Sequence, residues 1–149
     1  MPTSVILPPG GFSIAHWCLL VAALLPLACA YIAKAPGMKH RPGQRGFDNH
    51  EPRAWLAQQT GYQARANAAQ ANSFECLPFF IGALLVAWQL GAPSARVDGL
   101  AVAFVVLRIA YIALYVTDRA TLRSLAWALA LVVNPVSYTH LTLPTILLV

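Results

Sequence analysis

Three long stretches of the chain, residues 1–33, 76–95 and 124–149, contain no Asp, Glu, Lys or Arg. In a helix that rises about 1.5 Å per residue, about 20 apolar residues span the roughly 30 Å hydrocarbon core of a bilayer. Each uncharged stretch is long enough for that. Lipid rather than water is therefore the predicted surrounding of much of this chain, and helices are the predicted spanning elements.

The composition excludes several classes of protein. Hydrophobic residues make up 58% of the chain and charged residues 10%, and the net charge is +5. The charged share is less than half of the roughly 25% typical of soluble domains. A disordered chain, a collagen, a disulfide scaffold and a soluble nucleic-acid binder are all inconsistent with these values.

The cysteines and histidines suggest neither a disulfide framework nor a metal site. The three cysteines are odd in number, lie in apolar stretches and lack C-x-x-C spacing: Cys18, Cys29 and Cys76. Three of the histidines, His16, His40 and His50, are scattered along the sequence. We therefore expect buried thiols and no metal ion.

Hydrophobic segments predict an all-α integral membrane bundle of four helices, at about residues 13–33, 63–90, 97–117 and 123–135 onward. The first helix is expected to end at the breaker run Lys34-Ala35-Pro36-Gly37. Since no Lys or Arg precedes Lys34, this helix is predicted to be a retained span and not a cleaved signal peptide. A short helix over residues 52–59, starting with Pro52, is predicted in the polar loop that follows.

The distribution of Lys and Arg predicts the orientation in the membrane. Five of them follow the first helix and two follow the third, whereas the turn after the second holds one: Lys34, Lys39, Arg41, Arg45 and Arg53, then Arg119 and Arg123, against Arg96. By the positive-inside rule, the long first loop is cytoplasmic and both termini lie outside. The basic loop is expected to contact lipid headgroups and not nucleic acid.

The last fourteen residues are predicted to be an artefact. Residues 136–145 read VSYTHLTLPT, which resembles the translation of a transposon adapter used to prepare sequencing libraries. Residues 136–149 are therefore set apart from the membrane domain at 1–135 and given no function. The alternative is a genuine apolar end of the fourth helix.

Polar groups inside apolar helices are the candidate functional residues, because an ionisable residue in a span is costly. Glu75 and Arg108 are of this kind. Helical periodicity places Arg108, Tyr111, Tyr115 and Arg119 on one stripe about 80° wide, and Arg65, Asn72 and Glu75 on a similar stripe of the second helix. Two such stripes on antiparallel neighbours would form a polar cleft. Alternatively, the tyrosines are packing residues, Asn72 joins helices, and Glu75 and Arg108 neutralise each other.

Residues 65–79, RANAAQANSFECLPF, resemble the signature of the MAPEG family, the membrane-associated proteins in eicosanoid and glutathione metabolism. Asn72, Glu75 and Pro78 match its N-x-x-E-x-x-P motif. The R-x-x-Y-x-x-x-Y run that begins at Arg108 resembles the family's third helix, and the four-helix layout agrees over nearly all of residues 10–135. One departure is Ala68, which stands where glutathione-using members often carry an Arg.

The resemblance implies a homotrimer, of bacterial type and in an inner membrane, with glutathione bound between protomers. It would act as a transferase or peroxidase on lipophilic small molecules arriving from the lipid. It assigns the tripeptide to Asn72, Glu75, Arg108, Tyr111 and Tyr115, and its thiolate to Arg123, with Arg119 as a second candidate. A guanidinium beside a thiol with a pKa near 8.5 would lower that pKa. The alternative is a non-catalytic membrane protein whose polar stripes hold a trimer together; an ion pathway is a third, weaker alternative.

Overall fold

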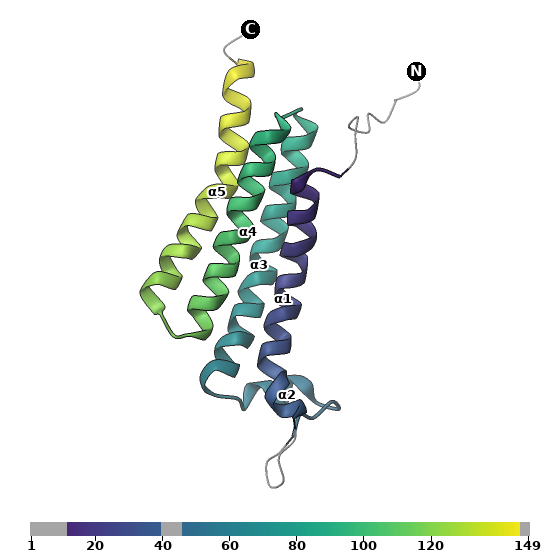
Figure 1. Ribbon diagram of the computed structural model, residues 1–149, viewed down its shortest axis with the longest axis vertical. Helices are drawn as coiled ribbons and strands as arrows, with labels where there is room; N and C mark the ends of the chain where they lie inside the picture. The colour runs from purple at the N-terminus through teal and green to yellow at the C-terminus, as the bar shows by residue number, and fades with distance from the viewer. Residues whose placement is uncertain (1–11, 40–45, 147–149) are drawn as a thin grey trace, which may run out of the picture.

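The computed structural model describes residues 12–39 and 46–146, with side chains described up to residue 133. This part of the chain contains five helices: α1 (Ile14–Met38), α2 (Pro52–Ala57), α3 (Gly61–Gln89), α4 (Ser94–Val116) and α5 (Ala120–Ile146) (Figure 1). It contains no strand, which confirms the predicted all-α class.

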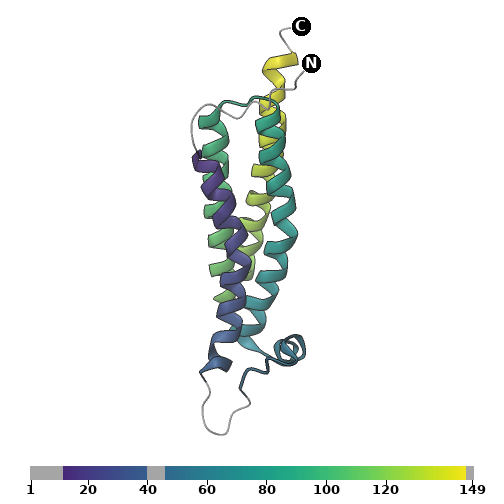
Figure 2. The same ribbon diagram turned by 90° about the vertical axis from the view of Figure 1, so that its right-hand side faces the viewer.

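The four long helices run up and down as antiparallel neighbours (Figures 1 and 2). α3 and α4 form the middle of the bundle, because α1 packs against both of them and α5 packs against both of them. Short α2 and the α4–α5 turn lie at one end of the bundle, which we call the α2 end (Figure 1). The α3–α4 turn and the start of α1 lie at the opposite end.

Three of the helices, α1, α3 and α4, are long and apolar enough to cross a membrane, and α5 contributes a shorter apolar segment, Ala120–Val133. Large apolar side chains point outward from the bundle, among them Trp17, Leu24, Val106 and Leu125. An outward apolar surface suits lipid and not water. The structure is thus the four-helix membrane bundle expected from the sequence.

The first helix continues to Met38, past the predicted end at residue 33. Pro36 removes one backbone donor, yet the Lys39 N–H still closes the last turn on the Ala35 carbonyl oxygen at 3.3 Å. The breaker run therefore lies inside the last turns. Gly37 has a separate reason to be there, since any side chain at this position would collide with the Trp55 ring.

The other boundaries differ by a few residues. α2 starts at Pro52 as expected and ends at Ala57. α4 starts at Ser94 and α5 at Ala120, each earlier than the sequence suggested, so Arg123 lies in the first turn of α5. That helix runs on through residue 146, while residues 147–149 lie outside the described part. The adapter origin of residues 136–149 stays a prediction.

The core consists of two clusters of buried, mainly apolar residues, one in each half of the bundle. Away from the α2 end, buried residues gather around Phe80 and Phe104, whose rings stack 4.1 Å apart. Nearer the α2 end, a second cluster forms around Cys29, Ala69 and Tyr111. Small residues let α1 approach α3 and α4 closely along both halves: Ala15, Cys18, Ala22, Pro26, Cys29 and Ala33 are all buried.

Candidate functional site

Arg108, on α4, is 2% exposed and donates to α3. Its Nη1 donates to Asn72 Oδ1 and its Nη2 to Ser73 Oγ, each at 3.0 Å, and the Cys76 sulfur lies 3.6 Å from Nη1. A buried guanidinium is costly unless its donors are used. Arg108 donates these hydrogen bonds to one neighbouring helix and so holds α4 against α3.

Asn72 links this arginine to a carboxylate. Its amide nitrogen donates to Glu75 Oε2 at 3.3 Å, while its amide oxygen accepts from Arg108. An Asn side chain carries both a donor and an acceptor, so it can bridge opposite charges. The pairing of Glu75 with Arg108 that the sequence left open is therefore made through Asn72. Glu75 itself is exposed on the surface of the single chain.

Aromatic rings extend the arrangement toward the α2 end. The Arg108 Cζ lies 4.4 Å from the centre of the Tyr111 ring, which meets Tyr115 edge to face at 5.6 Å. The Arg123 Cζ, in the first turn of α5, lies 4.2 Å from the centre of the Tyr115 ring. Both cation–ring distances fall within the roughly 6 Å of an attractive contact.

Together these contacts form one continuous line of side chains, which we call the polar row: Glu75, Asn72, Arg108, Tyr111, Tyr115 and Arg123. The polar row draws on α3, α4 and α5. It carries a carboxylate at one end and a half-buried guanidinium at the other, with an amide, the buried Arg108 guanidinium and two phenols between them. Chemically, a carboxylate is a partner for an ammonium group, and a guanidinium is a partner for a carboxylate.

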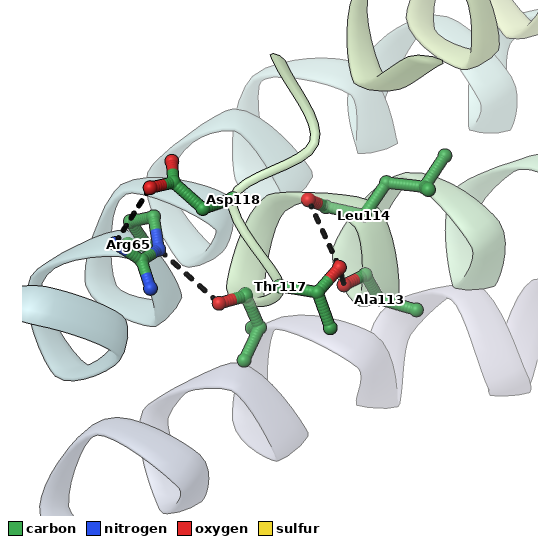
Figure 3. A network of polar contacts seen from close by, with 6 residues as sticks. Arg65, Ala113, Leu114, Thr117 and Asp118 are labelled. Atoms are coloured by element: carbon green, nitrogen blue, oxygen red, sulfur yellow. Dashed lines mark hydrogen bonds and ion pairs between the residues drawn. The ribbon is translucent and has the colours of Figure 1, made fainter.

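Two residues of the predicted stripes lie outside the polar row. Arg65 was expected beside Asn72 and Glu75, but its Nε donates to the Val116 carbonyl oxygen at 3.1 Å and its Nη1 lies 3.4 Å from Asp118 Oδ2 (Figure 3). Arg119 is exposed and contributes its backbone, since its N–H donates to the Leu114 carbonyl oxygen at 2.9 Å.

Sequence reasoning missed three residues around these groups. Ser73 and Cys76 were not named as partners of Arg108, although Cys76 lies four residues after Asn72 and three after Ser73 and so shares a helix face with each of them. Asp118 was not named as a functional residue either. Periodicity could have grouped the first two, whereas the pairing of Asp118 with Arg65 depends on the fold.

A hollow of about 850 Å³ lies beside α2, lined by Phe47, Asp48, Glu51 and Trp55 among others. It shares no lining residue with the polar row, so it is a separate feature of the α2 end. In the described ranges, no group of three or more His, Cys, Asp or Glu side chains is placed to hold a metal ion. The polar row is therefore the candidate site.

Comparison with known proteins gives one finding. The model of the MAPEG family matches residues 14–141, a range that contains the whole polar row. None of the curated proteins and none of the solved structures compared with the chain matches it.

Proposed function

The chain belongs to the MAPEG family, and we propose that this membrane protein binds glutathione at the polar row and directs its thiolate at lipophilic electrophiles. The activity would be that of a glutathione transferase or peroxidase. The observation that carries the proposal is the unbroken line of contacts from Glu75 to Arg123. A tripeptide with one ammonium, two carboxylates and a thiol is complementary to such a line.

The roles follow from the chemistry of the side chains. Glu75 and the Asn72 amide are suited to the ammonium and peptide groups of the ligand. Arg108 and the hydroxyl groups of Tyr111 and Tyr115 are suited to its carboxylates. Arg123 would stabilise the thiolate, and Arg119, which is exposed four residues earlier, is the second candidate for that role.

A thiolate is the reactive form in both reactions. A free thiol has a pKa near 8.5 and is mostly protonated at neutral pH, so a guanidinium that lowers this pKa increases the nucleophile. In transfer, the sulfur forms a bond to an electrophilic carbon, which loses its leaving group. In peroxide reduction, the thiolate sulfur attacks the terminal peroxide oxygen, the O–O bond breaks, and the departing alkoxide takes up a proton and leaves as an alcohol. The thiol of a second glutathione then attacks the resulting sulfenic acid, which releases water and leaves a disulfide.

Assembly as a homotrimer is part of the proposal. Glu75 is exposed on α3 of the single chain, and an uncovered carboxylate on a membrane helix is costly. A neighbouring copy would cover it and would complete a site between protomers. A bacterial inner membrane is the proposed location. The connection between α1 and α3 would lie in the cytoplasm, because basic residues gather there.

A non-catalytic role in trimer stability is the second candidate. It is favoured by two observations: a neighbouring copy would cover the exposed Glu75, and the Arg108 guanidinium is already hydrogen bonded to Asn72 and Ser73 without a ligand. Under this alternative the polar row only orders helices, and no ligand is needed.

Glutathione titrated into the detergent-purified protein by calorimetry, with a sizing run beside it, separates the two candidates. Glu75→Gln keeps the shape and removes the charge, so we expect glutathione binding to weaken by about 10- to 100-fold, as loss of a charge-assisted hydrogen bond implies. Glu51→Gln, at the start of α2, is the matched control and should bind as wild type does. If wild type binds no glutathione, or if Glu75→Gln loosens the assembly without changing binding, the enzymatic proposal is wrong.

A further inference from the structure

The C-terminus of α3 ends in a Schellman turn built on glycine. Gly91 has φ +67°, and its N–H donates to the Trp88 carbonyl oxygen at 3.1 Å. The next N–H, of Ala92, reaches back to the Ala87 carbonyl oxygen at 3.0 Å. This pair of bonds, with a left-handed residue just past the helix, is a common helix ending, and glycine is its usual occupant.

The C-terminus of α4 ends in the same turn with an aspartate in place of glycine. Asp118 has φ +64°, and its N–H donates to the Tyr115 carbonyl oxygen at 3.2 Å. The Arg119 N–H reaches the Leu114 carbonyl oxygen at 2.9 Å. Within the described part of the chain, Asp118 is the one residue other than glycine with a positive φ. Its conformation is less favourable than that of Gly91, so its side chain should contribute something glycine cannot.

That contribution is a contact with α3. The Asp118 carboxylate lies 3.4 Å from Arg65 Nη1, and Arg65 Nε donates to the Val116 carbonyl oxygen at 3.1 Å (Figure 3). Val116 is the last residue of α4, whose final carbonyl groups have no partner within the helix. Arg65 therefore completes the end of α4 from a different helix and is held there by Asp118.

The turn fixed in this way carries the end of the polar row. Arg119 directly follows Asp118, and its carbonyl oxygen accepts the Arg123 N–H at 3.0 Å in the first turn of α5. The Arg123 guanidinium then lies over Tyr115, which belongs to α4. A change in the turn would swing the first turn of α5 and move Arg123 away from the row.

We propose that Arg65 and Asp118 are positioning residues, whose contact holds the α4–α5 turn so that Arg123 stays over Tyr115 at the end of the polar row. The inference rests on the proposed function, in which Arg123 stabilises the glutathione thiolate. It also gives Arg65 a role that differs from ligand binding.

Asp118→Gly is the decisive variant, because glycine adopts the left-handed conformation readily and only the carboxylate is lost. We expect the protein to remain as stable as wild type, while turnover at neutral pH falls by about three- to tenfold, within the range typical of coupling residues. The rate profile should shift to higher pH, and the glutathione dissociation constant should stay within about twofold. Arg65→Gln should give the same loss, and the double variant should be no worse, since both changes remove one contact.

Two further variants guard against a merely structural effect. Asp118→Asn tolerates the left-handed conformation and keeps an oxygen that can accept from Arg65, so it should retain most of the turnover. Thr117→Ala removes a hydroxyl that donates to the Ala113 carbonyl oxygen at 2.8 Å in the same turn (Figure 3), without touching α3. It should leave the pH profile unchanged.

Hydrogen exchange of the amides of residues 119–124 gives a readout that needs no ligand. We expect faster exchange in Asp118→Gly and Arg65→Gln, and wild-type exchange in Thr117→Ala. Unchanged exchange and an unchanged pH profile in the first two variants would overturn the positioning role, even if glutathione binds. A wild type whose bound thiol keeps its ordinary pKa would instead overturn the proposed function, whatever the exchange data give.

Discussion

α3 and α4 are joined at two levels of the bundle by different means. Away from the α2 end, the stacked rings of Phe80 and Phe104 make the contact, 4.1 Å apart and 12° from parallel. Nearer the α2 end, Arg108 makes it through hydrogen bonds to Asn72 and Ser73. The same pair of helices is thus held by apolar packing at one level and by hydrogen bonds from a charged group at the other.

The two contacts differ in what they contribute to folding. Lipid is as apolar as a Phe ring, so the stacked join gains from close packing and not from leaving water. A buried arginine must first lose its hydration and then recover it from protein groups. An apolar join of similar size would hold the helices with less cost. The polar join is therefore the one that points to a ligand.

Removing the apolar join should have the largest effect on stability. Phe104→Ala leaves a cavity against Phe80, and we expect the free energy of unfolding in mixed micelles to fall by about 3 kcal/mol. Glutathione binding by the folded fraction should stay within about twofold of wild type. A loss of binding that exceeds the loss of folded protein would show that the Phe80–Phe104 contact belongs to the site.

Removing the polar join should lower stability somewhat less, but it should abolish the proposed glutathione binding. Arg108→Leu gives up two hydrogen bonds to α3, each worth about 0.6–1.7 kcal/mol between membrane helices, so we expect a loss of about 2 kcal/mol. Glutathione binding should disappear. Arg108→Lys keeps the charge but not the forked geometry and is expected to fall between wild type and Arg108→Leu in both measurements. Full binding by Arg108→Leu would remove this residue from the site.

The smallest effect is expected at the far end of the bundle, beyond the apolar join. Asp98, on α4, accepts from the Ala15 N–H at 2.8 Å and so caps the start of α1. Asp98→Ala should lower the free energy of unfolding by about 1 kcal/mol, as loss of a helix cap does. Asp98→Asn keeps an acceptor oxygen and should lose less. Glutathione binding should change in neither variant, and a change would tie this end to the site.

Much of the fold could be predicted because lipid imposes a simple rule on sequence. Apolar segments of about bilayer length predicted four helices, and chain segments that cross a membrane in succession are antiparallel. The end of α1 escaped prediction because Pro36 and Gly37 read as breakers locally. The need for glycine at position 37 depends on a distant partner, since the Trp55 ring of α2 packs where a side chain on Gly37 would lie.

Most residues of the candidate site could be predicted from the sequence, but the contacts between helices that connect them could not. Helical spacing placed Asn72 with Glu75 and Arg108 with the two tyrosines, because residues three or four apart share a face. It also grouped Arg65 with Asn72, whereas the structure pairs Arg65 with Asp118 near the end of α4. Helical spacing predicts which face of its own helix a residue occupies. Which residues of the neighbouring helix its side chain contacts depends on packing and on turn geometry.

The thiol pKa of bound glutathione, followed by thiolate absorbance against pH, tests the proposed role of the polar row most directly. We expect the wild-type protein to hold the bound thiol clearly below the free value near 8.5. Arg123→Ala should return it toward that value and depress turnover at neutral pH, with the rate partly recovered as pH rises, while binding changes less. Arg96→Ala, an exposed arginine at the opposite end, is the matched control. A wild-type thiol that titrates near 8.5, or a shift that persists in Arg123→Ala, would contradict the role assigned to the row and its terminal arginine.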